Sequence, residues 1–319
     1  MRPELTQALD RLKRSDVVAI PTETVYGLAA DARDESAVAR VFAFKGRPSN
    51  NPLIVHVSSI DVARRFVEWD DRATALFDRF APGPLSIVMP HRAGIADAVR
   101  AGRGTVAIRI PNHPLTLDLL RAFDGPLAAP SANQSNHVSP TTPEHVRTEF
   151  GDAVFVLDGG PCRVGIESTV LDLTLARPAI LRPGDVTLAQ IESVIGPVDV
   201  FTGHVDLSRD AASSPGQSSK HYAPRAQAVR FNAGDDATLR CLIRTGRCAA
   251  VLLRSRRLDL VATQVLGDDP SLAAARFYAA LRAVDSILPD LIAVELPPDE
   301  PAWLALRDRI LRATTTGKE

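Results

Sequence analysis

The 319-residue sequence has few cysteines and no long apolar run. Its three cysteines, Cys162, Cys241 and Cys248, are scattered without CxxC spacing. Such an odd set supports neither a disulfide framework nor a zinc cluster, and it fits a reducing cytoplasm, where we expect this protein. No stretch approaches the ~18 uncharged apolar residues of a membrane helix, so no membrane span is predicted.

An excess of charge of either sign is also lacking. The sequence has 37 basic and 38 acidic side chains, a formal net charge of −1 and 45% hydrophobic residues. That balance is typical of a folded globular protein and disfavours both disorder and general binding to polyanions. The length suggests two domains, at roughly 100 to 200 residues per domain.

The standard nucleotide and metal motifs are missing as well. The sequence contains no GxxxxGK[ST], no GxGxxG after a strand, no HExxH and no GxSxG. A conventional phosphate, dinucleotide, zinc or hydrolase site is therefore not predicted. Any nucleotide site in this chain must be unconventional.

Short apolar runs alternate with helical periodicity along most of the chain, which predicts an α/β fold. Strands are expected at 17–20, 53–57, 85–89, 105–110, 127–129, 153–157, 169–173 and 179–181, and helices at 5–12, 36–44, 73–80, 115–123, 143–150 and 188–194. These elements predict one large domain over residues 1–198.

The stretch from about 197 to 225 has no apolar period and is rich in serine, so it reads as a linker, with boundaries placed at 199–225. Beyond it, residues 226–319 again alternate strand and helix, at 228–231, 249–253, 272–287, 291–296 and 301–313. This predicts a small second α/β domain. Its 13 basic and 12 acidic residues argue against a basic nucleic-acid clamp.

A cluster of hydroxyl groups follows the first predicted strand. Pro21 cannot donate a ladder hydrogen bond and marks the end of strand 17–20. Ligands of open α/β sheets bind beyond the carboxyl ends of strands, so Thr22, Thr24 and Tyr26 are candidate ligand contacts. A turn with a helix cap, in which Thr24 or Thr22 bonds a backbone amide, fits the same residues.

Lysine is rare in this sequence, with four lysines beside 33 arginines. Lys45 stands two positions before Arg47 in a Gly/Pro loop, where an ammonium and a guanidinium together suit phosphates. A helix end at Gly46, whose dipole attracts cations, explains the same residues. His56 lies inside a predicted strand, where a hydrogen-bonded core histidine is the default.

Arg109 is the only charge in an apolar strand and requires an anion if it is buried. That anion could be a structural carboxylate or the carboxylate of a small substrate. The hydroxyl-rich segment 128–142 could form an anion nest or an ordinary surface loop. A hydroxyl in segment 165–169 and another cation in segment 182–184 also stand at expected strand ends.

Seven blocks, in this order, resemble the signature blocks of the Sua5/YrdC/YciO family: PTETVYGL at 21–28, KGRP with NPLIVH at 45–56, PGPLSIV at 82–88, VAIRIP at 106–111, APSAN with SPTT at 129–142, IESTV at 166–170 and LRPG at 181–184. The resemblance spans about residues 5–198. The long, Sua5-type form of the family adds a linker with SPG and HYAP elements, here at 214–216 and 221–224, and a small Rossmann-like domain. A YrdC-like twisted, open mixed sheet with helices is therefore implied, followed by that second domain.

The resemblance also implies an activity. L-threonine, bicarbonate or CO2, and ATP become threonylcarbamoyl-AMP and pyrophosphate, the first stage in making N6-threonylcarbamoyladenosine in tRNA. Matching positions imply threonine contacts at Thr24, His56, Arg109, Ala129 and Ser168, ATP contacts at Arg47, Asn51, Thr105, Ser131, Ser139, Arg182 and Tyr222, and catalytic roles for Lys45 and Arg47.

The implied reaction brings two anions together, an amino-acid carbamate and a triphosphate. Lys45, Arg47, Arg182 and a Mg²⁺ on the ATP phosphates would supply the positive charge, and positioning would do the rest. We therefore expect no nucleophilic side chain and assign no side chain as a metal ligand. The resemblance further implies downstream tRNA-modification proteins as partners and leaves a weak tRNA contact open.

Two other functions fit the same fold, an RNA-binding protein and a regulatory sensor of ATP or threonine. For the linker, we expect a lid that brings Tyr222 to the adenylate, with a passive tether as the alternative. Asn136 stands where relatives commonly have glycine, so a left-handed backbone is expected there.

Overall fold

The computed structural model describes residues 2–201, 221–256 and 258–316. The described residues divide into two compact units: a first unit of residues 2–135, 140–163 and 167–201, and a second unit of residues 136–139, 164–166, 221–256 and 258–316. Within the described residues, no helix is both long enough and apolar enough to cross a membrane.

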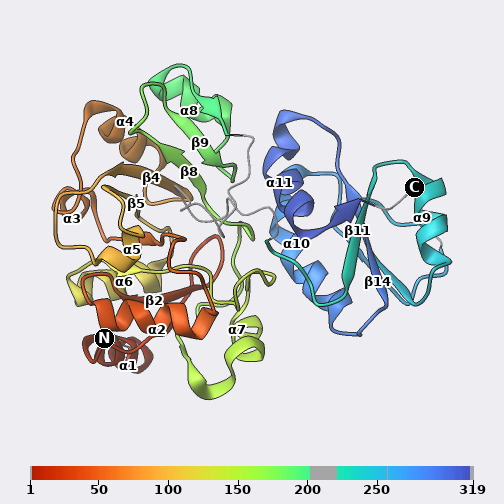
Figure 1. Cartoon of the computed structure of the whole chain (residues 1–319), viewed down its shortest axis with the longest axis horizontal. Coiled ribbons are helices and arrows are strands. Elements are labelled where there is room, and N and C mark those ends of the chain that lie inside the picture. Colours follow the sequence, from red (N-terminus) through yellow and green to blue (C-terminus); the bar gives the residue numbers. More distant parts are fainter. Residues whose placement is uncertain (1, 202–220, 257, 317–319) are drawn as a thin grey trace. The chain divides into compact units, whose positions relative to one another are not determined.

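The first unit is built on a ten-stranded mixed sheet (Figure 1). In spatial order its strands are β10 (Asp199–Val200), β9 (Ala179–Arg182), β8 (Thr169–Asp172), β4 (Leu85–Pro90), β5 (Thr105–Arg109), β3 (Ile54–His56), β6 (Leu127–Ala128), β2 (Gly27–Asp31), β1 (Val18–Ile20) and β7 (Phe155–Val156). Its helices are α1 (Pro3–Lys13), α2 (Glu35–Lys45), α3 (Ile60–Ala63), α4 (Asp71–Phe80), α5 (Asp97–Arg100), α6 (Pro114–Phe123), α7 (Pro143–Phe150) and α8 (Leu188–Ile195). The predicted α/β class with a mixed sheet is confirmed.

Local sequence signals set the ends of several helices. The Asp34 side chain accepts hydrogen bonds from the first backbone amides of α2, and Gly46 ends that helix in the left-handed conformation with φ 58°. Helix α8 starts with a capping box between Thr187 and Gln190. The helix end predicted at Gly46 is therefore confirmed.

Two strands of the first unit differ from the expectation. Strand β2, of sequence Gly-Leu-Ala-Ala-Asp, was not predicted because it has no β-branched residue. It pairs antiparallel with β1, with Ile20 opposite Gly27, so the hydroxyl-rich segment is the connection between two strands. Strand β10 lies inside the expected linker and pairs with β9, with Asp199 opposite Ala179.

The two faces of this sheet are covered differently. Helices α2, α4, α5 and α8 pack on one face together with Val55, Ile87 and Ile108. On the other side, α1 and α6 pack on residues of β1, β2 and β6. A separate small cluster comprises Ile54, Val88, Ala107, Val170, Ala179 and Leu181. Because side chains alternate along strands, these residues point away from the main core, and we call their side of β3, β5, β4, β8 and β9 the second face. Within the described residues, only strands contribute to this small cluster.

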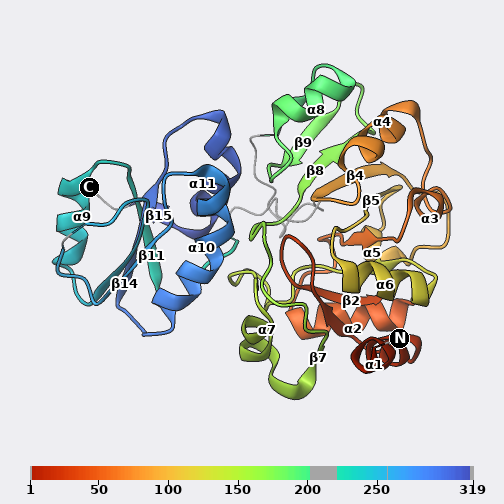
Figure 2. The same ribbon diagram turned by 180° about the vertical axis from the view of Figure 1, so that it is seen from behind.

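The second unit is built on a parallel five-stranded sheet (Figure 2). Its spatial order is β13 (Ala262–Val265), β12 (Cys248–Leu252), β14 (Leu291–Leu296), β11 (Gln227–Asn232) and β15 (Thr315–Thr316), with helices α9 (Asp236–Ile243), α10 (Pro270–Asp285) and α11 (Leu304–Ala313). The predicted second α/β domain is confirmed as a fold, although α9, β13 and β15 were not expected.

Candidate active site

The β1–β2 connection is folded by its own hydroxyl groups. Thr22 Oγ1 accepts from the backbone amides of Thr24 at 3.1 Å and Val25 at 3.2 Å, and donates to the Val25 carbonyl at 2.6 Å. Because a hydroxyl has a single proton, the 2.8 Å contact between the two threonine hydroxyls is donated by Thr24. The turn considered for these residues is thus confirmed, but the helix cap is not, because strand β2 and not a helix follows. The turn fixes the direction of the Thr24 hydroxyl.

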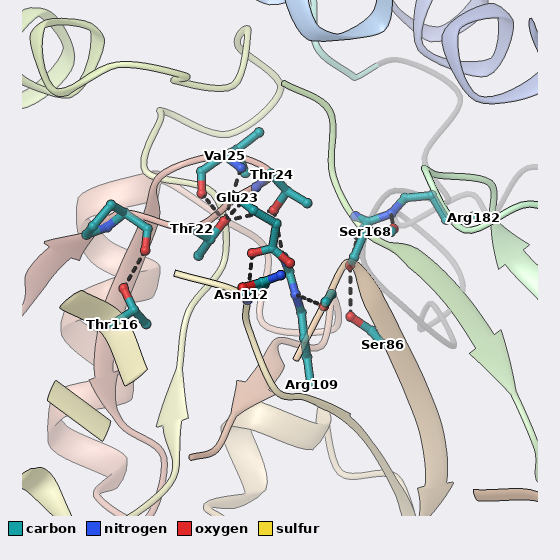
Figure 3. A network of polar contacts seen from close by, with 12 residues as sticks. Thr22, Glu23, Thr24, Val25, Ser86, Arg109, Asn112, Thr116, Ser168 and Arg182 are labelled. Carbon is teal, nitrogen blue, oxygen red and sulfur yellow. Dashed lines mark hydrogen bonds and ion pairs between the residues drawn. The ribbon is translucent and has the colours of Figure 1, made fainter. Parts of the chain in front are cut away.

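Arg109, at the carboxyl end of β5, is held by this turn (Figure 3). Its Nη2 lies 2.9 Å from Glu23 Oε1 and donates to Thr24 Oγ1 at 3.0 Å, while Nε donates to the Gly83 carbonyl at 3.3 Å. The side chains of Arg109 and Glu23 are 4% and 0% exposed. The other Glu23 oxygen accepts from the Asn112 amide at 3.0 Å. The structural carboxylate considered for Arg109 is therefore Glu23.

This arrangement still allows Arg109 to bind a ligand. The contacts to Glu23, Thr24 and Gly83 use Nε and Nη2, so a ligand carboxylate would meet the guanidinium through Nη1. The role that the resemblance implies for Arg109 stays a prediction.

His56 lies beside Arg109, because the two residues are in register on the parallel strands β3 and β5. Burial, and next the positive charge of Arg109, lower the pKa of His56 to about 3, so its imidazole is neutral at neutral pH. Its Nδ1 is buried and has no hydrogen-bond partner among the described residues. A buried polar atom of this kind needs an explanation, and a ligand beside Arg109 would provide one.

A second polar group connects β4, β8 and β9. Arg182 donates from Nε and Nη2 to the Ser168 carbonyl at 3.1 and 3.0 Å, and from Nη2 to Ser168 Oγ at 3.2 Å. The Ser168 hydroxyl is also 2.8 Å from that of Ser86 (Figure 3). A Cβ on Gly184 would lie 2.3 Å from the Thr169 nitrogen, so only glycine fits this close approach of two backbones.

Lys45 is buried and braces the loop after β6. Its Nζ donates to the carbonyls of Ser131 and Asn133, both at 2.6 Å. Burial, and then the neighbouring Arg47, hold the pKa of this ammonium well below its usual value. The sequence did not predict this bracing contact, and the proposed place of Lys45 near the phosphates stays a prediction.

Arg47 and Asn51 are brought together at the amino end of β3. Arg47 Nη2 donates to Asn51 Oδ1 at 2.6 Å and Nε donates to the Asn51 carbonyl at 3.1 Å. Thr105 begins β5 and Arg109 ends it, which separates their Cα atoms by about 13 Å. The alternation of β5 puts Thr105, Ala107 and Arg109 on the second face. Thr105 and Arg109 thus lie at opposite ends of β5 on the second face, whereas Arg182, expected for ATP, contacts Ser168, expected for threonine.

The segment with Ala129 and Ser131 runs beside the β1–β2 connection. The Ala129 amide donates to the Ile54 carbonyl at 3.0 Å, and Ser131 forms an antiparallel bridge with Gly27. A Cβ on Gly27 would be 3.2 Å from the Ala129 Cβ, so small residues on both segments permit this approach.

The remaining expected residues, Ser139 and Tyr222, belong to the second unit. Tyr222 has φ 63° and is 1% exposed, and its ring centroid lies 5.3 Å from Arg309 Cζ. Asn136 has φ 68°, which confirms the left-handed conformation expected there. The SPG element at 214–216, on which the lid hypothesis partly depends, lies outside the described residues.

Four residues of these networks were not assigned roles from sequence: Glu23, Ser86, Asn112 and Gly184. The sequence signal that could have assigned Glu23 to the site was its position between two threonines in the hydroxyl-rich segment. Its pairing with Arg109 depends on strand order, which no local pattern discloses.

Comparisons with known proteins cover nearly the whole chain. The family profile described as "Telomere recombination" matches residues 10–184, and the profile described as "Threonylcarbamoyl-AMP synthase, C-terminal domain" matches residues 186–315. A threonylcarbamoyl-AMP synthase of Bacillus subtilis is 39% identical, over 98% of this chain and 93% of that protein. One from Pyrococcus abyssi is 38% identical, over 95% and 92%. The crystal structure of P. abyssi Sua5 complexed with L-threonine aligns with a TM-score of 0.91 at 36% identity, covering 97% of this chain and 94% of that one.

Proposed function

Because this chain belongs to the Sua5/YrdC/YciO family in its long, Sua5-type form, we propose that it makes threonylcarbamoyl-AMP and pyrophosphate from L-threonine, bicarbonate or CO2, and ATP. It is an adenylyl-transferring enzyme. The observation that carries the proposal on this chain is the buried Arg109 guanidinium, in contact with the Thr24 hydroxyl and in register with the neutral His56. The relative with L-threonine bound supports threonine as the amino-acid substrate.

The threonine subsite that we propose lies at the carboxyl end of β5. Arg109 Nη1 binds the substrate carboxylate, and Glu23 keeps the guanidinium in place while Nη2 is engaged. His56 offers an uncharged Nδ1, so it adds a polar contact without a second charge. The Ser168 hydroxyl, held by Arg182 and Ser86, supplies a contact for the polar groups of threonine.

The reaction needs positive charge at the site more than it needs a covalent bond between substrate and protein. The neutral threonine amine attacks the carbon of CO2 and gives up a proton to water, which leaves a carbamate. A carbamate oxygen then bonds to the α-phosphorus as the bond to pyrophosphate breaks. Two like unit charges 4 Å apart repel by about 4 kcal/mol at an effective dielectric constant of 20. Arg47, Lys45 and Arg182 are the cations that would offset this repulsion.

Magnesium remains part of the proposal. Mg²⁺ prefers phosphate oxygens and water, with one or two carboxylates at most. The part of the chain that the structure describes has no group of three or more His, Cys, Asp or Glu side chains suited to a metal. We propose that Mg²⁺ is held chiefly by the ATP phosphates, where it would neutralise part of their charge.

The product would serve tRNA modification. A carbamoyl-adenylate is an activated acyl donor, so its carbamoyl group must be passed on before water hydrolyses it. We therefore propose that downstream tRNA-modification proteins consume it, with any contact between this chain and tRNA being weak and local.

A pyrophosphate-release assay tests the proposal. We expect release to require ATP, L-threonine and bicarbonate together, with threonylcarbamoyl-AMP detected by mass spectrometry. L-valine, which has the shape of threonine but no hydroxyl, is the matched control substrate and should react more slowly, because it leaves polar groups of the site unpaired. Pyrophosphate release that does not depend on threonine would refute the assignment.

A further inference from the structure

The second unit contains a cavity of about 410 Å³ at the carboxyl ends of its parallel strands. Gly234, which follows β11, and Arg254 and Arg256, which follow β12, line it together with Asp268, Glu295 and Trp303. The volume lies within the range of small-molecule sites. The function proposed above makes no use of this cavity.

The position of the cavity in the sheet is one where ligands bind in open α/β folds. Strands β12 and β14 are neighbours, yet β12 leads on to β13 at one edge while β14 leads on to β15 at the other. Loops that diverge in this way leave a crevice beyond the carboxyl ends of the two strands. Arg256 and Glu295 come from the two sides of that crevice.

A buried carboxylate fixes one of the arginines. Glu295, 2% exposed, accepts from the Leu253 amide at 2.8 Å through Oε2 and from Arg256 Nη2 at 2.7 Å through Oε1. Arg256 Nε is 3.3 Å from Asp236 Oδ1. These contacts hold the guanidinium on two sides and fix its direction.

The third nitrogen of this guanidinium lacks an acceptor. Arg256 Nη1 is buried and has no hydrogen-bond partner among the described residues. Leaving a buried donor unpaired destabilises a fold, so such an atom, in a residue that lines a cavity, indicates a missing acceptor. Arg254, 75% exposed and paired with Asp268 at 2.8 Å, brings a second cation to the same cavity.

We propose that this cavity binds a small molecule carrying an oxyanion, a phosphate or carboxylate group, through Arg256 Nη1 and Arg254. Glu295 is the positioning residue that orients Arg256, and Trp303 supplies apolar surface for the rest of the ligand. None of the residues that line this cavity is assigned to the proposed synthase reaction.

Tryptophan fluorescence of the full chain tests this site. The sequence has two tryptophans, Trp69 in the first unit and Trp303 in the cavity, so Trp69→Phe leaves emission from the second unit alone. Inorganic phosphate, AMP and L-threonine are titrated separately. We expect a saturable change with at least one of them; phosphate would identify a free oxyanion, AMP alone a nucleotide, and threonine alone an amino acid.

Substitutions then locate the binding. Arg256→Gln should weaken it about tenfold to a hundredfold, the usual range for a charge-assisted hydrogen bond. Arg240→Gln, an exposed arginine on α9 that does not line the cavity, should leave affinity unchanged. If Arg256→Gln does not fold, the exposed Arg254→Gln replaces it and should weaken binding severalfold. The proposal would be overturned by a fluorescence change that is linear in ligand concentration for all three probes, or by cavity variants that bind as tightly as the unsubstituted cavity. Either result counts whatever the pyrophosphate assay shows.

Discussion

The buried pair of Arg109 and Glu23 allows the structural and substrate roles of the arginine to be separated. Arg109→Ala removes the guanidinium and leaves a carboxylate that is 0% exposed without its ion partner. An uncompensated buried charge of this kind costs about 3–5 kcal/mol. We expect the unfolding free energy of the first unit to fall by that amount.

Adding Glu23→Gln to Arg109→Ala should restore most of this stability. The double variant removes both charges, and replacing a buried ion pair by neutral groups is often close to neutral in free energy. The glutamine carbonyl can still accept from the Asn112 amide, which now donates to Glu23 at 3.0 Å.

Activity should not return with stability. Without Arg109 the threonine carboxylate loses charge-assisted hydrogen bonds of about 1.5–3 kcal/mol, so kcat/KM for threonine should stay roughly tenfold to a hundredfold low. Glu23→Gln alone keeps the guanidinium and should keep threonine-dependent turnover.

Two measurements on each variant separate the structural role of Arg109 from its substrate role. One is urea unfolding followed by Trp69 fluorescence in a Trp303→Phe background, and the other is pyrophosphate release over a range of threonine concentrations. Arg121→Ala is the matched control, since it breaks an ion pair whose side chains are 61% and 56% exposed and should cost less than about 1 kcal/mol. A double variant that recovers both stability and kcat/KM for threonine would show that Arg109 serves the fold alone.

Three further predictions concern the same unit. Lys45→Met removes two hydrogen bonds to loop carbonyls and should lower the unfolding free energy by about 2–3 kcal/mol, with an unchanged value in urea unfolding contradicting the bracing role. Gly184→Ala places a Cβ 2.3 Å from the Thr169 nitrogen and should cost about 2 kcal/mol or more, whereas Gly104→Ala meets nothing within 4 Å and should change unfolding by under about 1 kcal/mol; equal effects would count against the close approach. The folded-state pKa of His56, about 3, is below its ordinary 6.5, so only the unfolded chain takes up this proton between those values, and stability should fall as pH drops from 6.5 toward 3. In denaturation measurements from pH 7 to 4, the stability of His56→Gln should fall less steeply than that of the unsubstituted protein. Parallel profiles of stability against pH would refute this contribution of His56.

Local patterns were sufficient for the class of fold and for much of the site. Helical periodicity, strand-length apolar runs and the helix end at Gly46 depend on contacts within a few residues, so the sequence displays them directly. The hydroxyl-rich turn after β1 is equally local, since Thr22 bonds to residues two and three positions away. The ordered signature blocks then identified the family.

Tertiary structure alone decided which groups meet. Arg109 and Thr24 are 85 residues apart, and Lys45 is 86 residues from Ser131, so their contacts depend on strand order and loop placement. The same holds for Arg256 and Glu295, 39 residues apart on loops and strands of the second unit. Sequence shows which residues carry charge, but a buried charge takes the partner that the packed sheet brings within bonding distance. The partner of Arg109 is therefore set by the places of β1, β2 and β5 in the sheet.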